Sequence, residues 1–133
     1  TGFDCFADDT GLEVKALNGM PGVFLKRFAG INASSEDNIN KLLNLLENQT
    51  DRSAQFKTII SLHLNGKIKT FEGICKGNIA YEKMGEFGFG YDPIFIPENK
   101  ELSFGQMSMQ DKNKIAHRGK AIKKLIDYLT NLY

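Results

Sequence analysis

The sequence predicts an α/β protein in which helices flank a mixed central β-sheet, and three periodic segments carry that prediction. Residues 55–64 alternate apolar and polar side chains, as a strand with one buried face does. Residues 34–48 place apolar side chains at i, i+3, i+4 and i+7, as an amphipathic helix does. A second amphipathic pattern follows residue 108. The length of 133 residues fits a single domain over 1–133.

Two short strands are expected near the N-terminus, a buried strand over 4–7 and a second strand over 12–17. The dipeptides Asn-Gly at 18–19 and Pro-Gly at 21–22 then predict a loop. Ser34 or Ser35 caps the helix over 34–48, because acidic residues suited to a first turn follow directly. The stripe that this helix buries consists of Ile39, Leu42, Leu43 and Leu46.

The strand over 55–64 is expected to pass through a tight turn at Asn65 and Gly66 into a second strand over 67–75. Gly73 predicts a bulge in that second strand, whose alternation is less regular. His63 falls among the outward polar positions of the first strand, so we expect a solvated surface histidine rather than a catalytic one. The inward face consists of Phe56, Ile60, Leu62 and Leu64.

One last helix is expected to follow Ser108, which can cap it, with Asp111 three residues on. Lys112, His117 and Arg118 lie in its N-terminal half. Such a cluster is most often a solvated basic face, but its donors also suit a purine that carries acceptors at O6 and N7. The buried stripe of this helix is predicted to be Ile115, Ile122, Leu125, Ile126 and Leu129.

Composition predicts a cytoplasmic protein that binds neither nucleic acid nor membranes. The net charge of +1 supplies no electrostatic footprint for DNA or RNA. Cys5 and Cys75 are the two cysteines, and their spacing predicts neither a disulfide framework nor a zinc site. No apolar run approaches the roughly 18 residues that cross a bilayer.

The acidic pair Asp8 and Asp9 is the first candidate for chemistry, because it follows an apolar run and precedes Thr10 and Gly11. Neighbouring side chains on a strand point to opposite faces, so one aspartate can face a cleft while the other anchors a turn. Hard carboxylate oxygens suit Mg²⁺ shared with a phosphate substrate. A plain Asx-turn that closes the strand is the competing interpretation.

The glycine-rich segment over 85–90 is the second candidate, although its spacing is not that of a dinucleotide fingerprint. Phe89 offers a flat π-face on which a purine can stack. Gly88 and Gly90 let the backbone approach a ligand, and Asp92 offers an acceptor. An ordinary surface loop is the competing interpretation.

Three motifs in order resemble the Ham1 family of inosine triphosphate pyrophosphatases. They are Asp-Asp-Thr-Gly-Leu at 8–12, Gly-Phe-Gly-Tyr-Asp-Pro-Ile-Phe at 88–95 and Lys-Asn-Lys-Ile-Ala-His-Arg-Gly-Lys-Ala at 112–121. The connecting segments at 18–23 and 27–30 are also similar to that family, so the resemblance runs from about Phe6 to the C-terminus. It implies an ITPase-like fold and Mg²⁺-dependent hydrolysis of ITP, dITP and XTP to the monophosphate and pyrophosphate. It further implies a homodimer that cleanses the nucleotide pool of deaminated purines.

The resemblance also assigns roles to individual residues. Asp9 matches the general base and metal-linked carboxylate of the family, and Asp8 is expected to support the turn and the metal shell. The residues expected to contact the nucleotide are Thr10, Phe89, Gly90, Tyr91, Asp92, Lys112, His117 and Arg118.

The chain departs from the family pattern mainly at its beginning. Family members carry a Ser/Thr-x-Asn-x-x-Lys loop that grips the triphosphate and a Glu-containing helical segment, and neither precedes Asp8 here, so the chain is expected to be N-terminally truncated relative to the family. Thr10 stands where serine is usual and keeps the hydroxyl, whereas Ala116 loses one. Two alternatives to the enzyme therefore stay open, a purine-nucleotide-binding fragment without activity and a structural domain whose acidic turn binds nothing.

Overall fold

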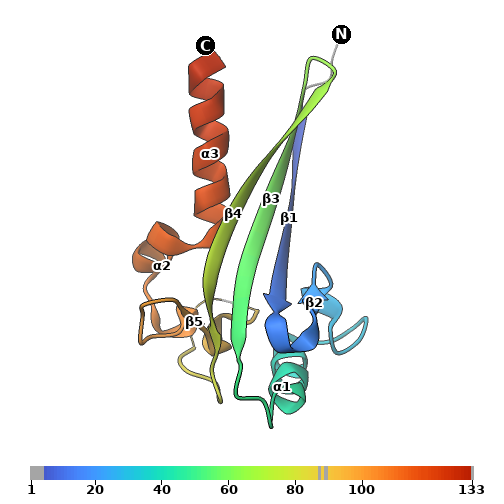
Figure 1. Ribbon diagram of the computed structural model, residues 1–133, viewed down its shortest axis with the longest axis vertical. Coiled ribbons are helices and arrows are strands. Elements are labelled where there is room, and N and C mark those ends of the chain that lie inside the picture. Colours follow the sequence, from blue (N-terminus) through green and yellow to red (C-terminus); the bar gives the residue numbers. More distant parts are fainter. Residues whose placement is uncertain (1–4, 87, 89, 133) are drawn as a thin grey trace.

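The computed structural model describes residues 5–86, 88 and 90–132, and its centre is a five-stranded sheet in the order β2-β1-β3-β4-β5. Figure 1 shows three long strands side by side, with β2, β5 and α1 gathered at one end of the molecule. The α/β class with a helix-flanked sheet is confirmed, and every pairing among the described strands is antiparallel. The strands are β1 (Cys5–Val14), β2 (Pro21–Gly22), β3 (Ser53–Leu64), β4 (Lys67–Ile79) and β5 (Phe95–Pro97).

β1 is one continuous strand, so the prediction of two short strands separated by an acidic turn is wrong. Asp8 pairs with Ile60 and Gly11 with Lys57, in an unbroken register along β3. This long-range pairing outweighs the poor strand preference of Asp and Gly. The residues expected to end a second strand, Lys15–Leu17, form a 3₁₀ helix instead. Residues 4–7 were predicted to form a buried strand, and this is also wrong within the described residues, because the Phe6 side chain is 64% exposed.

The β3–β4 hairpin has the predicted turn. Asn65 and Gly66 both have positive φ, at 53° and 76°, as a type I′ turn requires. The bulge predicted at Gly73 is wrong, because Gly73 faces Thr58 within a regular register. A Cβ on Gly73 would instead overlap the carbonyl oxygen of His117, so glycine is needed here for a close helix–strand approach. His63 is exposed, as predicted.

α1 (Ser35–Leu45) confirms the first predicted helix, although it ends three residues early. Ser34 is the cap: its hydroxyl accepts from the backbone N–H of Asp37, whose carboxylate accepts from the N–H of Ser34. The side chains of Ile39 and Leu42 are buried against the core.

The C-terminal segment forms two helices, α2 (Met109–Ile115) and α3 (His117–Leu132), where the sequence predicted one. Ser108 caps α2 as predicted, but Ala116 is extended at ψ 150° and ends it. α3 then runs along β3 and β4, as Figure 1 shows. The predicted stripe is wrong at two positions, because Ile122 and Ile126 are exposed while α3 buries Ala121 and Leu125.

Among the described residues, the buried apolar side chains form two clusters. The larger cluster includes the rings of Phe56, Phe95 and Phe104, and the Phe95 ring packs at a tilted angle on the other two. The smaller one packs α3 on the sheet through Ile60, Leu62, Phe71, Ala121 and Leu125. No helix among the described residues is long and apolar enough to cross a membrane.

Candidate active site

A cavity of about 970 Å³ lies where β1, the start of α3 and two connecting loops meet. Its volume is in the range of small-molecule sites. Phe89 lies outside the described residues, but every other predicted site residue lines this cavity: Asp8, Asp9, Thr10, Gly90, Tyr91, Asp92, Lys112, His117 and Arg118. Three motifs that are far apart in the sequence therefore border one space, while the role of each residue stays a prediction.

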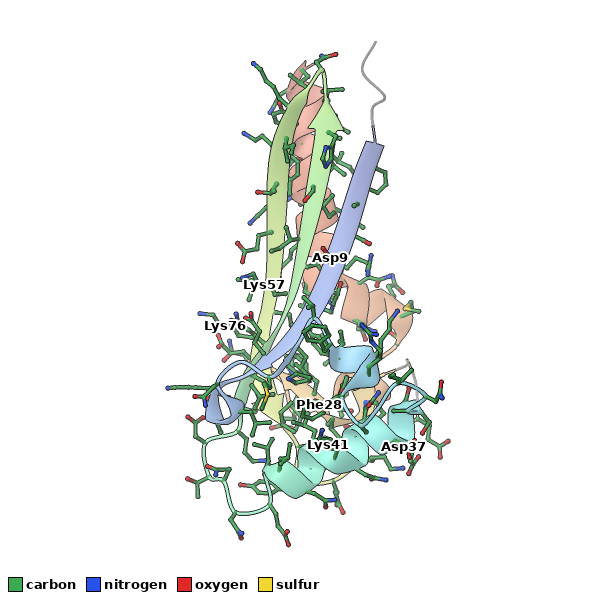
Figure 2. The ribbon with its side chains drawn as sticks, turned by 90° about the vertical axis from the view of Figure 1, so that its right-hand side faces the viewer. Asp9, Phe28, Asp37, Lys41, Lys57 and Lys76 are labelled. Carbon is green, nitrogen blue, oxygen red and sulfur yellow. The ribbon has the colours of Figure 1, made fainter. Side chains whose placement is uncertain are left out.

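The two adjacent aspartates point to opposite faces of β1. Asp8 and Thr10 share the face that α3 covers, since they pair with Ile60 and Thr58, and Asp9 lies on the other face. Figure 2 shows Asp9 midway along β1 rather than at a strand end. The cavity nevertheless touches both faces, because the described part of the chain pairs the outer edge of β1 only at Leu12 and Glu13.

Arg118, in the first turn of α3, reaches back to β1. Its Nη1 pairs with a carboxylate oxygen of Asp8, and its Nη2 donates to Thr10 Oγ1 at 3.2 Å. The Thr10 hydroxyl also lies 2.9 Å from the hydroxyl of Thr58. One carboxylate, of Asp8, and one hydroxyl, of Thr10, therefore orient the guanidinium at the cavity wall.

Lys112 and Asp92 form a second ion pair, at 2.6 Å, which is largely excluded from water. Asp92 begins a 3₁₀ helix (Asp92–Ile94), and Lys112 Nζ also lies 5.4 Å from the centre of the Phe104 ring. A Cβ on Gly88 would overlap the Asp92 carboxylate, and Gly88 has φ 77°. The loop therefore needs glycine at 88 to fold over this ion pair.

His117 is a neutral histidine held flat against a buried aromatic ring. Its ring lies 4.7 Å from that of Phe56, with 17° between the planes. Burial lowers the pKa of His117 to about 4, and the positive charges of Lys112, Arg118 and Lys120 add to that shift. Nδ1 is buried and has no hydrogen-bond partner among the described residues.

Tyr91 and Asn38 hold the wall that faces α3. The Tyr91 hydroxyl donates to the carbonyl of Leu25 at 2.6 Å, and burial raises the pKa of that hydroxyl. The Asn38 side chain bridges the N–H of Ala29 and the carbonyl of Lys26. The Asn38 contacts fix the segment after β2, including the 3₁₀ helix Leu25–Arg27, against α1, and the Tyr91 contact fixes the same segment against the loop before Asp92. Figure 2 shows Phe28, from this segment, beside Lys41 of α1.

Three residues around the cavity were missed from the sequence. The strand pattern predicts Phe56 as a core side chain, but its ring also stacks against that of His117. Asn38 is buried on α1 next to the apolar stripe. The available signal in the sequence was a polar residue beside that stripe, because a polar group buried there needs hydrogen-bond partners. Thr58 gave no signal, because its partner Thr10 is set by strand register alone.

The acidic residues of the site do not form a metal cage by themselves. Within the described residues no group of three or more His, Cys, Asp or Glu side chains could hold a metal ion. Asp9 is the carboxylate at the cavity for which the described residues provide no ion pair. Mg²⁺ is commonly held by one or two carboxylates together with substrate phosphates, so the site fits that mode.

The described residues of this α/β fold bring carboxylates, cations and aromatic rings together around one cavity. Comparison with known proteins gives the family. The Ham1 family model matches residues 1–128, and the chain belongs to that family.

The curated relatives and solved structures cover nearly all of this chain. The dITP/XTP pyrophosphatase of Flavobacterium johnsoniae is 58% identical over 129 residues, 97% of this chain and 67% of the relative. That of Flavobacterium psychrophilum is 55% identical over 98% of this chain and 68% of its own length. The structure of the Staphylococcus aureus Ham1 protein superposes with a TM-score of 0.95 at 47% identity, over 98% of this chain and 68% of that one. The chain thus spans about two thirds of the length of these relatives.

Proposed function

We propose that the protein hydrolyses the non-canonical purine nucleoside triphosphates ITP, dITP and XTP to the monophosphate and pyrophosphate. One observation carries the proposal: a single cavity gathers the acidic motif of β1, the loop before β5 and the basic start of α3. Membership of the Ham1 family supports the same reaction, since its curated relatives are named dITP/XTP pyrophosphatases. Those names favour hydrolysis over nucleotide binding alone.

Asp9 is the proposed general base and the main metal ligand. Its carboxylate takes a proton from the water that attacks the α-phosphorus, and the bond from that phosphorus to the bridging oxygen breaks. Asp8 is the second proposed metal ligand, although its carboxylate meets Arg118 here. Mg²⁺ bound with the triphosphate supplies charge neutralisation on the departing pyrophosphate.

The basic residues of α2 and of the start of α3 are the proposed readers of the base. Lys112, His117 and Arg118 line the cavity and supply donors that suit the O6 and N7 acceptors of a 6-oxopurine. Adenine presents an amino group at position 6, which meets these donors unfavourably.

The loop before β5 is the proposed base platform. Phe89 is proposed to stack on the purine, and Gly90, Tyr91 and Asp92 to contact the nucleotide. Tyr91 is 3% exposed and its hydroxyl is engaged by Leu25, so its contribution would be a ring surface rather than a hydroxyl donor.

Cytoplasmic location, a homodimer and the absence of nucleic-acid binding are further proposals. The near-neutral net charge supports the last of these, and family resemblance supports the dimer. Light scattering after gel filtration measures the oligomeric state directly.

The decisive experiment follows pyrophosphate release from ITP, dITP and XTP, with ATP and GTP as comparisons, in the presence of Mg²⁺. We expect Asp9→Asn to abolish turnover while the protein unfolds at an unchanged temperature, since Asn keeps the shape but cannot take a proton. Asp127→Asn, an exposed change on α3, is the matched control and keeps wild-type activity. Near-wild-type turnover in Asp9→Asn would remove Asp9 from its proposed role.

A further inference from the structure

A buried hydroxyl lies directly behind the cavity wall. Thr58, in the middle of β3, is 0% exposed and is not among the residues that line the cavity. It lies directly opposite Thr10 in the β1–β3 register, and the two hydroxyl oxygens are 2.9 Å apart. Figure 1 shows the two strands running side by side along their whole length. Within the described part of the chain, the Thr58 hydroxyl is therefore linked to the cavity through Thr10.

The protons on these two hydroxyl groups can be assigned from their partners. Arg118 has no acceptor atoms, so Thr10 Oγ1 accepts the hydrogen bond from Nη2. Among the described residues, Thr10 is the one hydrogen-bond partner of the Thr58 hydroxyl. If Thr10 donated to Thr58, the Thr58 proton would be buried without an acceptor, which is costly. The favoured arrangement has Thr58 donating to Thr10.

This assignment has a consequence for the cavity. When Thr10 Oγ1 accepts from both Arg118 and Thr58, its own proton is not used by either of them. Thr10 lines the cavity, so that proton is available to an acceptor oxygen of a bound ligand. Accepting two hydrogen bonds also polarises the Thr10 O–H and makes it a stronger donor.

We propose that Thr58 is a positioning residue: its hydroxyl donates to Thr10 and thereby leaves Thr10 to donate to a nucleotide oxygen. The inference rests on the proposed function, because it names a residue that acts on the same site. Thr58 also steadies Arg118 through the shared Thr10 oxygen, so one buried hydroxyl orients two groups of the cavity wall.

A double-mutant cycle on the protein tests this proposal, with kcat/KM for ITP as the readout. Thr58→Val keeps the shape of the side chain and removes the hydroxyl. We expect it to lower kcat/KM about three- to tenfold, the range that one neutral hydrogen bond accounts for. Thr58→Ser restores the hydroxyl and is expected to stay within about twofold of wild type.

The decisive variant is Thr58→Val in a Thr10→Val background. We expect no further loss of kcat/KM there, because the Thr58–Thr10 hydrogen bond is already absent. Thr70→Val, on the exposed part of β4, is the matched control and leaves kcat/KM unchanged. An unfolding temperature measured for every variant separates a kinetic effect from a structural one. The proposal is overturned if Thr58→Val matches wild type, or if its loss is equally large in the Thr10→Val background.

The role of Thr58 can also be tested if the wild-type protein shows no activity. If it hydrolyses none of the triphosphates but binds ITP, the proposed function fails, and the same cycle is measured on the Kd from calorimetry. If it binds no nucleotide, both proposals are wrong.

Discussion

Two carboxylate–cation pairs border the cavity, and water reaches them very differently. The side chains of Lys112 and Asp92 are 12% and 7% exposed, whereas those of Arg118 and Asp8 are 51% and 38% exposed. Breaking a buried pair by removing one partner leaves a desolvated charge, but breaking an exposed pair costs little. The first pair is therefore a fixed part of the wall, and the second is the one that a ligand can rearrange.

The difference in exposure assigns different roles to two cations of the motif at residues 112–121. Lys112 and Arg118 are only six positions apart, yet the extended residue Ala116 puts them on different helices. Lys112 points to the loop before β5, and Arg118 points to β1. We infer that Lys112, besides its proposed contact with the base, holds that loop in place, whereas Arg118 is the cation that a ligand can draw away from its partner.

The largest effect on stability is expected from breaking the buried pair. Lys112→Met keeps the length of the side chain and removes its charge, so the Asp92 carboxylate loses its charged partner. We expect the free energy of unfolding to fall by roughly 3–5 kcal/mol. Urea unfolding monitored by circular dichroism measures this change.

The matched control is the double variant Lys112→Met with Asp92→Asn, which removes both charges. It should recover part of the lost stability, because an amide is less costly to bury than a carboxylate. A single variant that unfolds like wild type would show that the buried pair does not brace the loop.

His117 lies between the two pairs and gives the next largest effect, as a dependence of stability on pH. Its pKa is about 4 in the folded protein and 6.5 as a free side chain, so the unfolded state binds more protons between these values. Stability is therefore complete above about pH 6.5 and is lost as the pH falls toward 4. The expected loss is about 2 kcal/mol by pH 5.

The measurement is urea unfolding of wild type and His117→Gln at pH 7.5 and pH 5. His117→Gln should reduce the pH dependence by that amount, while His63→Gln, at the exposed histidine, leaves it unchanged. An equal pH dependence in wild type and His117→Gln would mean that His117 is freely protonated in the fold.

Arg118→Ala tests whether the exposed pair contains the ligand-reading cation. Losing a charge-assisted hydrogen bond costs roughly 1.5–3 kcal/mol, so kcat/KM for ITP should fall about ten- to a hundredfold. ATP lacks the 6-oxo acceptor and should lose about threefold or less, so the ITP-to-ATP ratio of kcat/KM is the readout. Lys123→Ala, an exposed change on the same helix, is the control. Equal losses for both substrates would mean that Arg118 contacts phosphate or only holds the helix.

Local signals in the sequence account for the parts that were predicted correctly. Ser34 with Asp37 marks the start of α1, and Asn65 with Gly66 marks the hairpin turn, because both depend on residues a few positions apart. Local patterns singled out the acidic pair, the glycine-rich segment and the basic cluster as candidates, but left a structural alternative open for each. Family resemblance then supplied the roles of the individual residues.

Several of the errors concern partners far along the chain, whereas the break between α2 and α3 at Ala116 is local. β1 continues through Asp8 and Asp9 because β3, some fifty residues later, pairs with it in register. Helical periodicity marks a stripe but not where a sheet covers it, so Ile122 and Ile126 were wrongly placed inside. The pairing of Arg118 with Asp8 joins residues 110 positions apart and has no signal in either motif.

Asp8→Asn is expected to have the smallest effect on the free energy of unfolding, because it weakens the exposed pair rather than the buried one. The change removes the charge that Arg118 meets but keeps an acceptor of the same shape, so unfolding should lose less than about 1 kcal/mol. Because both side chains are partly exposed, that loss should shrink further in about 1 M salt, where screening is strong. Urea unfolding of wild type and Asp8→Asn at low and high salt measures both quantities, with Asp127→Asn as the control for a lost surface charge. A salt-insensitive loss as large as that of Lys112→Met would show that the two pairs are equally fixed. Arg118 would then be part of the rigid wall, and a ligand could not recruit it by displacing Asp8.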